Sequence, residues 1–346
     1  MSSRHIASYW LLGALLLPGI ALAQPLAPRP LKPDNKRFPR LSAELGKQTL
    51  RRMVKAEMSL SFQAHEITVG RDGRTMEQWV KRDPKRGVRR ESLQPTGLLL
   101  VDNRQRQFLI HQRDKRYQES KSQLAEMQKR FSQVLRAGDK ALVIELQGQD
   151  TVAGRATDVV LVQPRPGLAV PSRRFWVDRE TGLCLRTEER APDGRILSNT
   201  YFLSLDLNPV LRDEDFAPPP VPPGFRRIVD NQKHYASIEE ALKEGVVVKQ
   251  PGWLPDGFRL RRITTPHGGH NLVHVQWGNE MTAITLVSSH GALPLIVLKR
   301  LAGGESGFVE LPKGERAYAW KSPEGYYMLL GNLPDDQLKR IADSVK

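Results

Sequence analysis

The clearest pattern in the chain is a period-two alternation of apolar and polar positions between residues 150 and 216. Alternate apolar side chains occur in residues 183–189 and again in residues 201–207. This spacing is typical of β-strands that bury one face. Gly182 and Gly194 follow residues that favour tight turns between such strands. The region is therefore predicted to be a β-meander, and it contains no catalytic arrangement.

Two earlier segments have helical spacing instead. A first helix is predicted over residues 41–57 with Ser42 as its N-cap. A second is predicted over residues 120–135, where Ser120 and Gln123 form a capping-box pattern. The two apolar stripes consist of Leu45, Leu50, Met53 and Val54 in the first helix and of Leu124, Met127, Phe131, Val134 and Leu135 in the second.

Further strands are predicted around these helices, at residues 60–69, 75–81, 89–93, 97–101, 107–112 and 141–146. A sheet with so many strands and only two helices must curl over the helices to bury its apolar face. The predicted fold class is α+β. It consists of a strongly curved antiparallel β half-barrel covered by helices, followed by a smaller α+β domain.

A proline-rich stretch separates these two domains. Residues 217–224 read APPPVPPG, and such a stretch is stiff and poor in N–H donors, as linkers often are. The half-barrel is predicted over residues 41–216 and the second domain over residues 225–346. The candidate hinge consists of Pro218, Pro219, Pro220, Pro222 and Pro223.

The beginning of the chain predicts export. Arg4 precedes an apolar run over residues 9–22 that ends in a small-x-small site before Gln24. Residues 1–23 are therefore interpreted as a signal peptide cleaved after Ala23, since the run is too short to span a bilayer. Residues 24–40 are predicted to be a disordered basic arm. A periplasmic location follows, and the absence of a cysteine after the site argues against lipid attachment.

Charge and cysteine content restrict the partners. The chain of 346 residues has a formal net charge of +15, spread as arginine pairs such as Arg89-Arg90 and Arg173-Arg174. Such a field favours anionic partners, and nucleic acid is not expected outside the cytoplasm. Cys184 is the single cysteine, so no internal disulfide can form. A half-buried strand residue is a better interpretation of Cys184 than a reactive thiol.

Motifs for catalysis are not found in the sequence. His267, His270 and His274 have a spacing that could suit zinc, but no cysteine or carboxylate pattern accompanies them. The chain has neither a G-x-S-x-G nucleophile motif nor a phosphate-binding loop. The sequence therefore predicts a protein that is not an enzyme and needs no metal or cofactor.

Several ordered segments resemble one known family. These are LRRMVKAE followed by SLSFQAHEITV, then VAGRATDVVLVQP, FWVDRETGLCLRTEERAPDGRIL and YFLSLDLNPVLRDEDFAP, and after the linker WLPDGFRLR and LLGNLPDDQLKRIADSV. In this order they resemble the MucB/RseB regulators, whose first domain is similar to the half-barrel of the lipoprotein carriers LolA and LolB. The resemblance extends past the linker, where that to the carriers stops. The arm before Leu41 and the basic segment Arg82 to Arg90 do not fit the family pattern.

The resemblance implies a regulator that binds the periplasmic part of a membrane-spanning anti-sigma factor and controls its proteolysis during envelope stress. It also implies that a lipid or a misfolded envelope component occupies the protein and competes with the partner, with acyl chains held inside the half-barrel. The basic charge suits anionic lipid. A carrier of the LolA/LolB type is the alternative, and the sequence leaves a homo-oligomer open. The expected hydrophobic ligand pocket is lined by Met53, Phe62, Trp79, Phe131 and Leu135.

Overall fold

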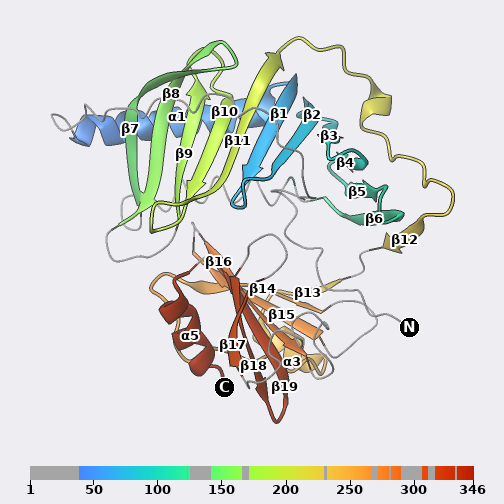
Figure 1. The fold of residues 1–346 in the computed structure, drawn as a ribbon, viewed down its shortest axis with the longest axis vertical. Coiled ribbons are helices and arrows are strands. Elements are labelled where there is room, and N and C mark those ends of the chain that lie inside the picture. The colour runs from blue at the N-terminus through green and yellow to red at the C-terminus, as the bar shows by residue number, and fades with distance from the viewer. Residues whose placement is uncertain are drawn as a thin grey trace. The chain divides into compact units, whose positions relative to one another are not determined.

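The structure is a computed structural model and describes residues 39–122, 124, 142–165, 171–229, 232–265, 272–279, 282–289, 306–310, 316–331 and 333–346. These residues are mostly in β-strands, with few helices (Figure 1). They form two compact units. The first contains the described residues of 39–165 and 172–229, and the second contains those from 232 onward. The predicted signal peptide and most of the predicted second helix lie outside the described residues.

The described residues of the first unit form a strongly curved, open sheet of 12 strands (Figure 1). Its strand order is β12-β6-β5-β4-β3-β2-β1-β11-β10-β9-β8-β7. The strands are β1 Phe62–Gly70, β2 Thr75–Asp83, β3 Gly87–Gln94, β4 Leu98–Asp102, β5 Arg106–His111, β6 Arg116–Lys121, β7 Leu142–Val152, β8 Arg155–Pro164, β9 Ser172–Asp178, β10 Cys184–Arg190, β11 Ile196–Asp206 and β12 Arg226–Val229. The predicted meander corresponds to β8 through β11, which pair in sequence order.

Helix α1, Pro39–Ser59, packs against β7, β8 and β9. It comes close to β7 because Gly46 has no side chain; a Cβ there would lie 3.1 Å from the Leu146 nitrogen. Ser42 lies inside the helix, and its hydroxyl donates to the Leu146 carbonyl at 2.9 Å. The prediction that Ser42 caps this helix is therefore wrong.

Alternation along the strands produces the main core of this unit. In β1 the buried positions are Phe62, Ala64, Glu66 and Thr68. Phe62 and Ala64 join a cluster with buried apolar residues of the neighbouring strands, among them Val80, Val88 and Leu100. Since consecutive side chains of a strand point to opposite faces, the intervening residues of β1 face away from this cluster.

One predicted helix start is a strand instead. Ser120 lies in β6, opposite Gln107 of β5, and does not cap a helix. Tyr117 and Glu119 of the same strand are buried at alternate positions, which is the spacing of a half-buried strand. Ladder pairing with β5 outweighs the capping-box pattern at Ser120 and Gln123.

The second unit is a seven-stranded antiparallel sheet among the described residues, in the order β13-β14-β15-β16-β19-β18-β17. Helix α3, Ile238–Lys243, begins after Ser237, whose hydroxyl accepts from the Glu240 N–H. Helix α5, Asp335–Asp343, packs against β18 and β19 and buries Leu338, Ile341 and Ala342. The strands are β13 Lys233–Tyr235, β14 Arg259–Thr265, β15 Leu272–Gly278, β16 Ala283–Ser289, β17 Ser306–Glu310, β18 Arg316–Ser322 and β19 Gly325–Gly331.

Within the described part of the chain, no helix is both long and apolar enough to cross a membrane.

Candidate functional site

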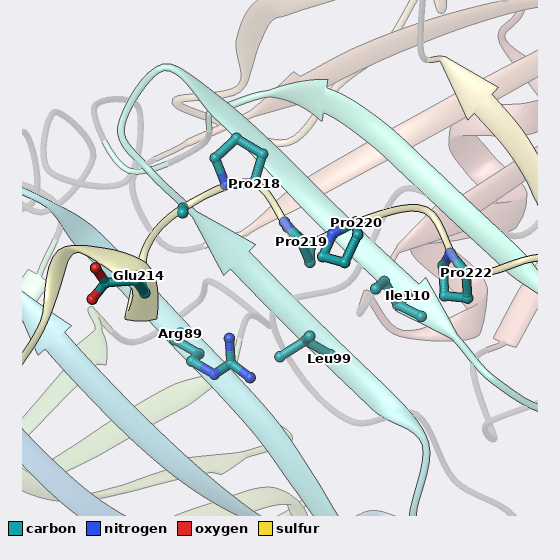
Figure 2. A pocket seen from close by; sticks show the side chains of 9 residues that line it. Arg89, Leu99, Ile110, Glu214, Pro218, Pro219, Pro220 and Pro222 are labelled. Carbon is teal, nitrogen blue, oxygen red and sulfur yellow. The ribbon is translucent and has the colours of Figure 1, made fainter.

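The proline-rich residues 217–224 lie across the first sheet as an extended segment, called here the proline strap. It begins after the short helix η3, Asp213–Asp215, and leads into β12. Figure 2 shows Pro218, Pro219, Pro220 and Pro222 above the strands that carry Leu99 and Ile110. The strap therefore follows the surface of the sheet.

Ion pairs hold the beginning of the strap to β2 and to the turn after it. The Lys81 ammonium lies 2.6 Å from Asp215, and the Arg86 guanidinium lies 3.1 Å from Asp213. The guanidinium of Arg86 also stacks over the buried Phe216 ring, 5.2 Å from its centroid. Together these contacts form a latch between η3 and the β2–β3 hairpin.

Two carboxylates at the latch, Asp215 and Asp83, have a lowered pKa. Burial alone would raise the pKa of Asp215, but hydrogen bonds from Lys81 and from the Arg212 N–H outweigh it and lower that pKa. Burial opposes ionisation of Asp83 as well, yet hydrogen bonds from the Arg86 side chain and from nearby backbone N–H groups lower its pKa to about 2. The latch therefore persists at neutral pH.

A second set of contacts holds the far end of the strap. The Tyr117 hydroxyl donates to the Pro219 carbonyl at 3.2 Å, and the Arg226 N–H donates to the Lys115 carbonyl at 2.8 Å. β12 then pairs in parallel with β6, and Arg227 lies 2.7 Å from Glu119. The second domain was predicted to begin at Phe225, but residues 226–229 belong to the first sheet.

These anchors correct the interpretation of the prolines as a free hinge. Prolines cannot donate to a ladder, which made a linker the natural prediction. The segment is nevertheless fixed before and after Pro218, Pro219, Pro220, Pro222 and Pro223 by side chains of β2 and β6. The β-branched pair Ile228-Val229 was the sequence signal that a strand follows the prolines.

An apolar hollow of about 410 Å³ lies between the strap and the sheet. Leu99 and Ile110 form its floor, the prolines form one wall, and Arg89 and Glu214 bring charge to it (Figure 2). Ile110 also belongs to a cluster on this face with Val101, Phe108 and Tyr117, against which Leu99 and Phe225 pack. The arrangement suits a short apolar group with a polar end.

Among the described residues of the predicted ligand pocket, Trp79 does not lie with Phe62. Met53 and Phe62 are buried, with 2% and 3% of their surface exposed, whereas Trp79 is 38% exposed and stacks on His65 at 4.9 Å. Phe62 pairs with Arg82 and His65 with Trp79, so alternation places Trp79 on the face opposite Phe62. Including Trp79 in that pocket was wrong. Phe131 and Leu135 lie outside the described residues.

The other candidate residues are consistent with structural roles. Burial raises the pKa of Cys184 to about 12, so its thiol is neutral and a poor nucleophile. Among the described residues, no group of three or more histidine, cysteine or acidic side chains is arranged to hold a metal ion. His274 lies in β15, and His267 and His270 lie outside the described residues.

Comparison with known proteins decides the family. The family model for the MucB/RseB N-terminal domain matches residues 46–220, about half of the chain. The chain belongs to the MucB/RseB family. No curated protein matches it.

Two solved structures share the fold of this MucB/RseB chain. One is described as the complex structure of Pseudomonas aeruginosa MucA/MucB and is 20% identical with a TM-score of 0.55. The other is described as MucB in complex with MucA(peri) and is 19% identical, also with a TM-score of 0.55. Each alignment covers 87% of this chain and 98% of the other. The likeness thus includes most of both units.

Proposed function

We propose that this protein is a periplasmic regulator, without catalytic activity, that binds the periplasmic part of a membrane-spanning anti-sigma factor. The observation that carries the proposal is membership of the MucB/RseB family through residues 46–220. Support comes from the shared fold with a MucB chain bound to MucA(peri), which extends over 87% of this chain. The two units act as separate domains in this proposal, a half-barrel and a companion used for recognition.

We propose further that binding shields the anti-sigma factor from proteolysis and that lipid releases it. Release requires that lipid and partner disfavour each other, with a coupling free energy on the order of 1–3 kcal/mol. The apolar hollow under the strap supports an acyl group better than the predicted interior pocket, because it is a space of about 410 Å³ lined by Leu99, Ile110 and the prolines. Met53 and Phe62 of the predicted pocket are instead buried. Exposed arginines of the same unit suit anionic headgroups.

A capture experiment tests the central proposal. The intact protein is immobilised and mixed with the purified periplasmic fragment of the single-span anti-sigma factor of the same organism. We expect stoichiometric capture, and protection of the fragment from its site-specific protease. A scrambled fragment of the same composition is the control. Recovery of acylated lipoproteins without the fragment would instead support a carrier of the LolA/LolB type.

Lipid release is tested in the same assay. Vesicles of phosphatidylglycerol are added to the complex, with phosphatidylcholine vesicles as the matched control. We expect the anionic vesicles to release the fragment and restore its cleavage, while the zwitterionic vesicles leave it bound. Retention in both cases would contradict the lipid part of the proposal and leave partner binding intact.

A further inference from the structure

Three arginines converge on one carboxylate on strands β9 and β10 of the first sheet. Arg174 of β9 and Asn199 of β11 both lie opposite Glu188 of β10. The Glu188 carboxylate lies 3.5 Å from Arg174, 3.3 Å from Arg186 and 2.6 Å from Arg190. We call Arg174, Arg186 and Arg190 the guanidinium cluster. Its three positive charges meet a single carboxylate, so the cluster carries a surplus of positive charge.

A tryptophan organises the cluster. Trp176 lies opposite Arg186 in the ladder, and the Arg186 guanidinium stacks 4.1 Å from the centroid of its ring. Arg174 lies over the same ring at 5.9 Å, and the indole N–H donates to Asp150 at 2.9 Å. Stacking on an aromatic face fixes a guanidinium plane while leaving its outer N–H groups free to bind a carboxylate. The cluster is therefore preorganised.

Neutral side-chain acceptors bind only some of the N–H donors of the guanidinium cluster. The Nε of Arg174 donates to Gln147 at 2.8 Å, and the Nε of Arg186 donates to Asn199 at 3.0 Å. Each guanidinium has five N–H donors. The bonds to Gln147 and Asn199, together with those to Glu188, use a minority of these donors. Burial first, and then the neighbouring Arg190 and Arg186, lower the pKa of Arg174 despite the attraction of Glu188. A further anion would relieve that repulsion.

Exposure differs across the cluster in a way that suits a ligand. The side chain of Glu188 is 4% exposed, whereas those of Arg174 and Arg190 are 27% and 37% exposed. The inner carboxylate thus holds the arginines in place, and their outer edges reach solvent. A guanidinium matches a carboxylate bidentately, and two neighbouring arginines can hold acidic side chains of an extended chain.

We propose that the guanidinium cluster binds acidic side chains of an extended peptide segment in the protein's partner. This rests on the proposed function, since the partner is the periplasmic part of an anti-sigma factor, and it assigns that segment an acidic character. The net charge of +15 favours the approach of such a segment. Recognition itself depends on Arg174 and Arg190, which reach solvent from a fixed position.

The test uses a fluorescein-labelled octapeptide of alternating Glu and Ala, and a matched peptide with Gln at each Glu. Anisotropy titrations with the intact protein compare the wild type with R174Q/R190Q. The control variant R116Q/R195Q also loses two positive charges, from exposed arginines that pair with Asp114 and Asp193. We expect the cluster variant to bind the Glu peptide roughly tenfold more weakly and the control at most about twofold more weakly.

Other outcomes would overturn the proposal. Equal weakening in both variants would show that net charge alone attracts the peptide, and equal binding of the Glu and Gln peptides would exclude carboxylate recognition. Cluster-dependent binding to phosphatidylglycerol vesicles without peptide binding would reassign the site to a phosphate headgroup. Circular dichroism and thermal unfolding check the fold. R190Q, which leaves Arg174 and Arg186 on Glu188, replaces the double variant if that variant unfolds.

Capture of the anti-sigma fragment separates this inference from the proposed function. If wild type and R174Q/R190Q capture the fragment equally, the acidic-segment inference fails and the regulator remains. If neither captures it but the Glu peptide still depends on the cluster, the site stands and the proposed partner is wrong.

Discussion

At the scale of single residues, position within the alternation decides what each side chain does. Phe62 is 3% exposed, and its ring centroid lies 5.6 Å from that of Phe202. Trp79 lies on the opposite face of the sheet. Phe62→Ala should lower the free energy of unfolding by about 3–5 kcal/mol, the usual cost of truncating a buried aromatic residue. Trp79→Ala should cost less than half as much. Urea unfolding measures both, and similar losses would mean that Trp79 belongs to the core after all.

The sequence predicted such faces only where the strand register could be deduced. Period two in residues 60–69 indicates which residues of β1 share a face, but not how Trp79 of β2 aligns with them. That alignment depends on the turn of residues 71–74, where Gly73 has a φ of 75°. Bulges also shift the pairing, as between Cys184 and Arg186. In the guanidinium cluster, alternation along β10 indicates that Arg186, Glu188 and Arg190 share a face. Arg174 of β9 joins them only through the ladder, which the sequence does not report.

His274 makes stability depend on pH. Burial first, and then the nearby Arg262, lower its pKa from an ordinary 6.5 to about 4. Between these values the unfolded chain binds a proton that the folded chain does not, so stability is complete above pH 6.5 and falls as the pH drops toward 4. The loss should reach at most about 3 kcal/mol. Urea unfolding at several pH values should show a smaller decline for His274→Gln, and parallel curves would exclude His274 as the source.

At the scale of elements, η3 and the strap behave as part of the sheet. Phe216 is buried beneath Arg86, and truncating it removes the apolar contact that seats the strap. Phe216→Ala should therefore reduce the free energy of unfolding by about 2–4 kcal/mol. Val210→Ala is the matched control, because Val210 is 84% exposed a few residues earlier. If thermal unfolding gives the two variants the same stability, Phe216 does not hold the strap and the segment is a loose linker.

Element types were largely predictable, while their connections were not. The meander of β8 to β11 and the caps of α3 follow from local patterns that agree with the final fold. Latch and strap depend on Lys81, Arg86 and Tyr117, which lie about 100 or more residues before the residues of the latch and strap that they bond. No local pattern reports such contacts. Composition therefore suggested a free linker where long-range ion pairs fix the chain.

At the scale of the whole molecule, the position of β12 determines where the first unit ends. A fragment of residues 24–229 keeps the parallel ladder with β6 and the pairing of Arg227 with Glu119. A fragment of residues 24–224 loses both and leaves Glu119, which is 7% exposed at its side chain, with Arg106 as its remaining ion-pair partner among the described residues. Losing these hydrogen bonds should cost about 1–3 kcal/mol.

Thermal unfolding of the two fragments checks this boundary. The fragment ending at residue 229 should unfold at a midpoint about 2–12 °C higher than the one ending at residue 224. Arg227→Ala in the longer fragment should lower its unfolding midpoint by part of this difference, because the substitution removes the ion pair with Glu119 and leaves the β12–β6 ladder. Identical midpoints would place the end of the first unit before the β12 strand.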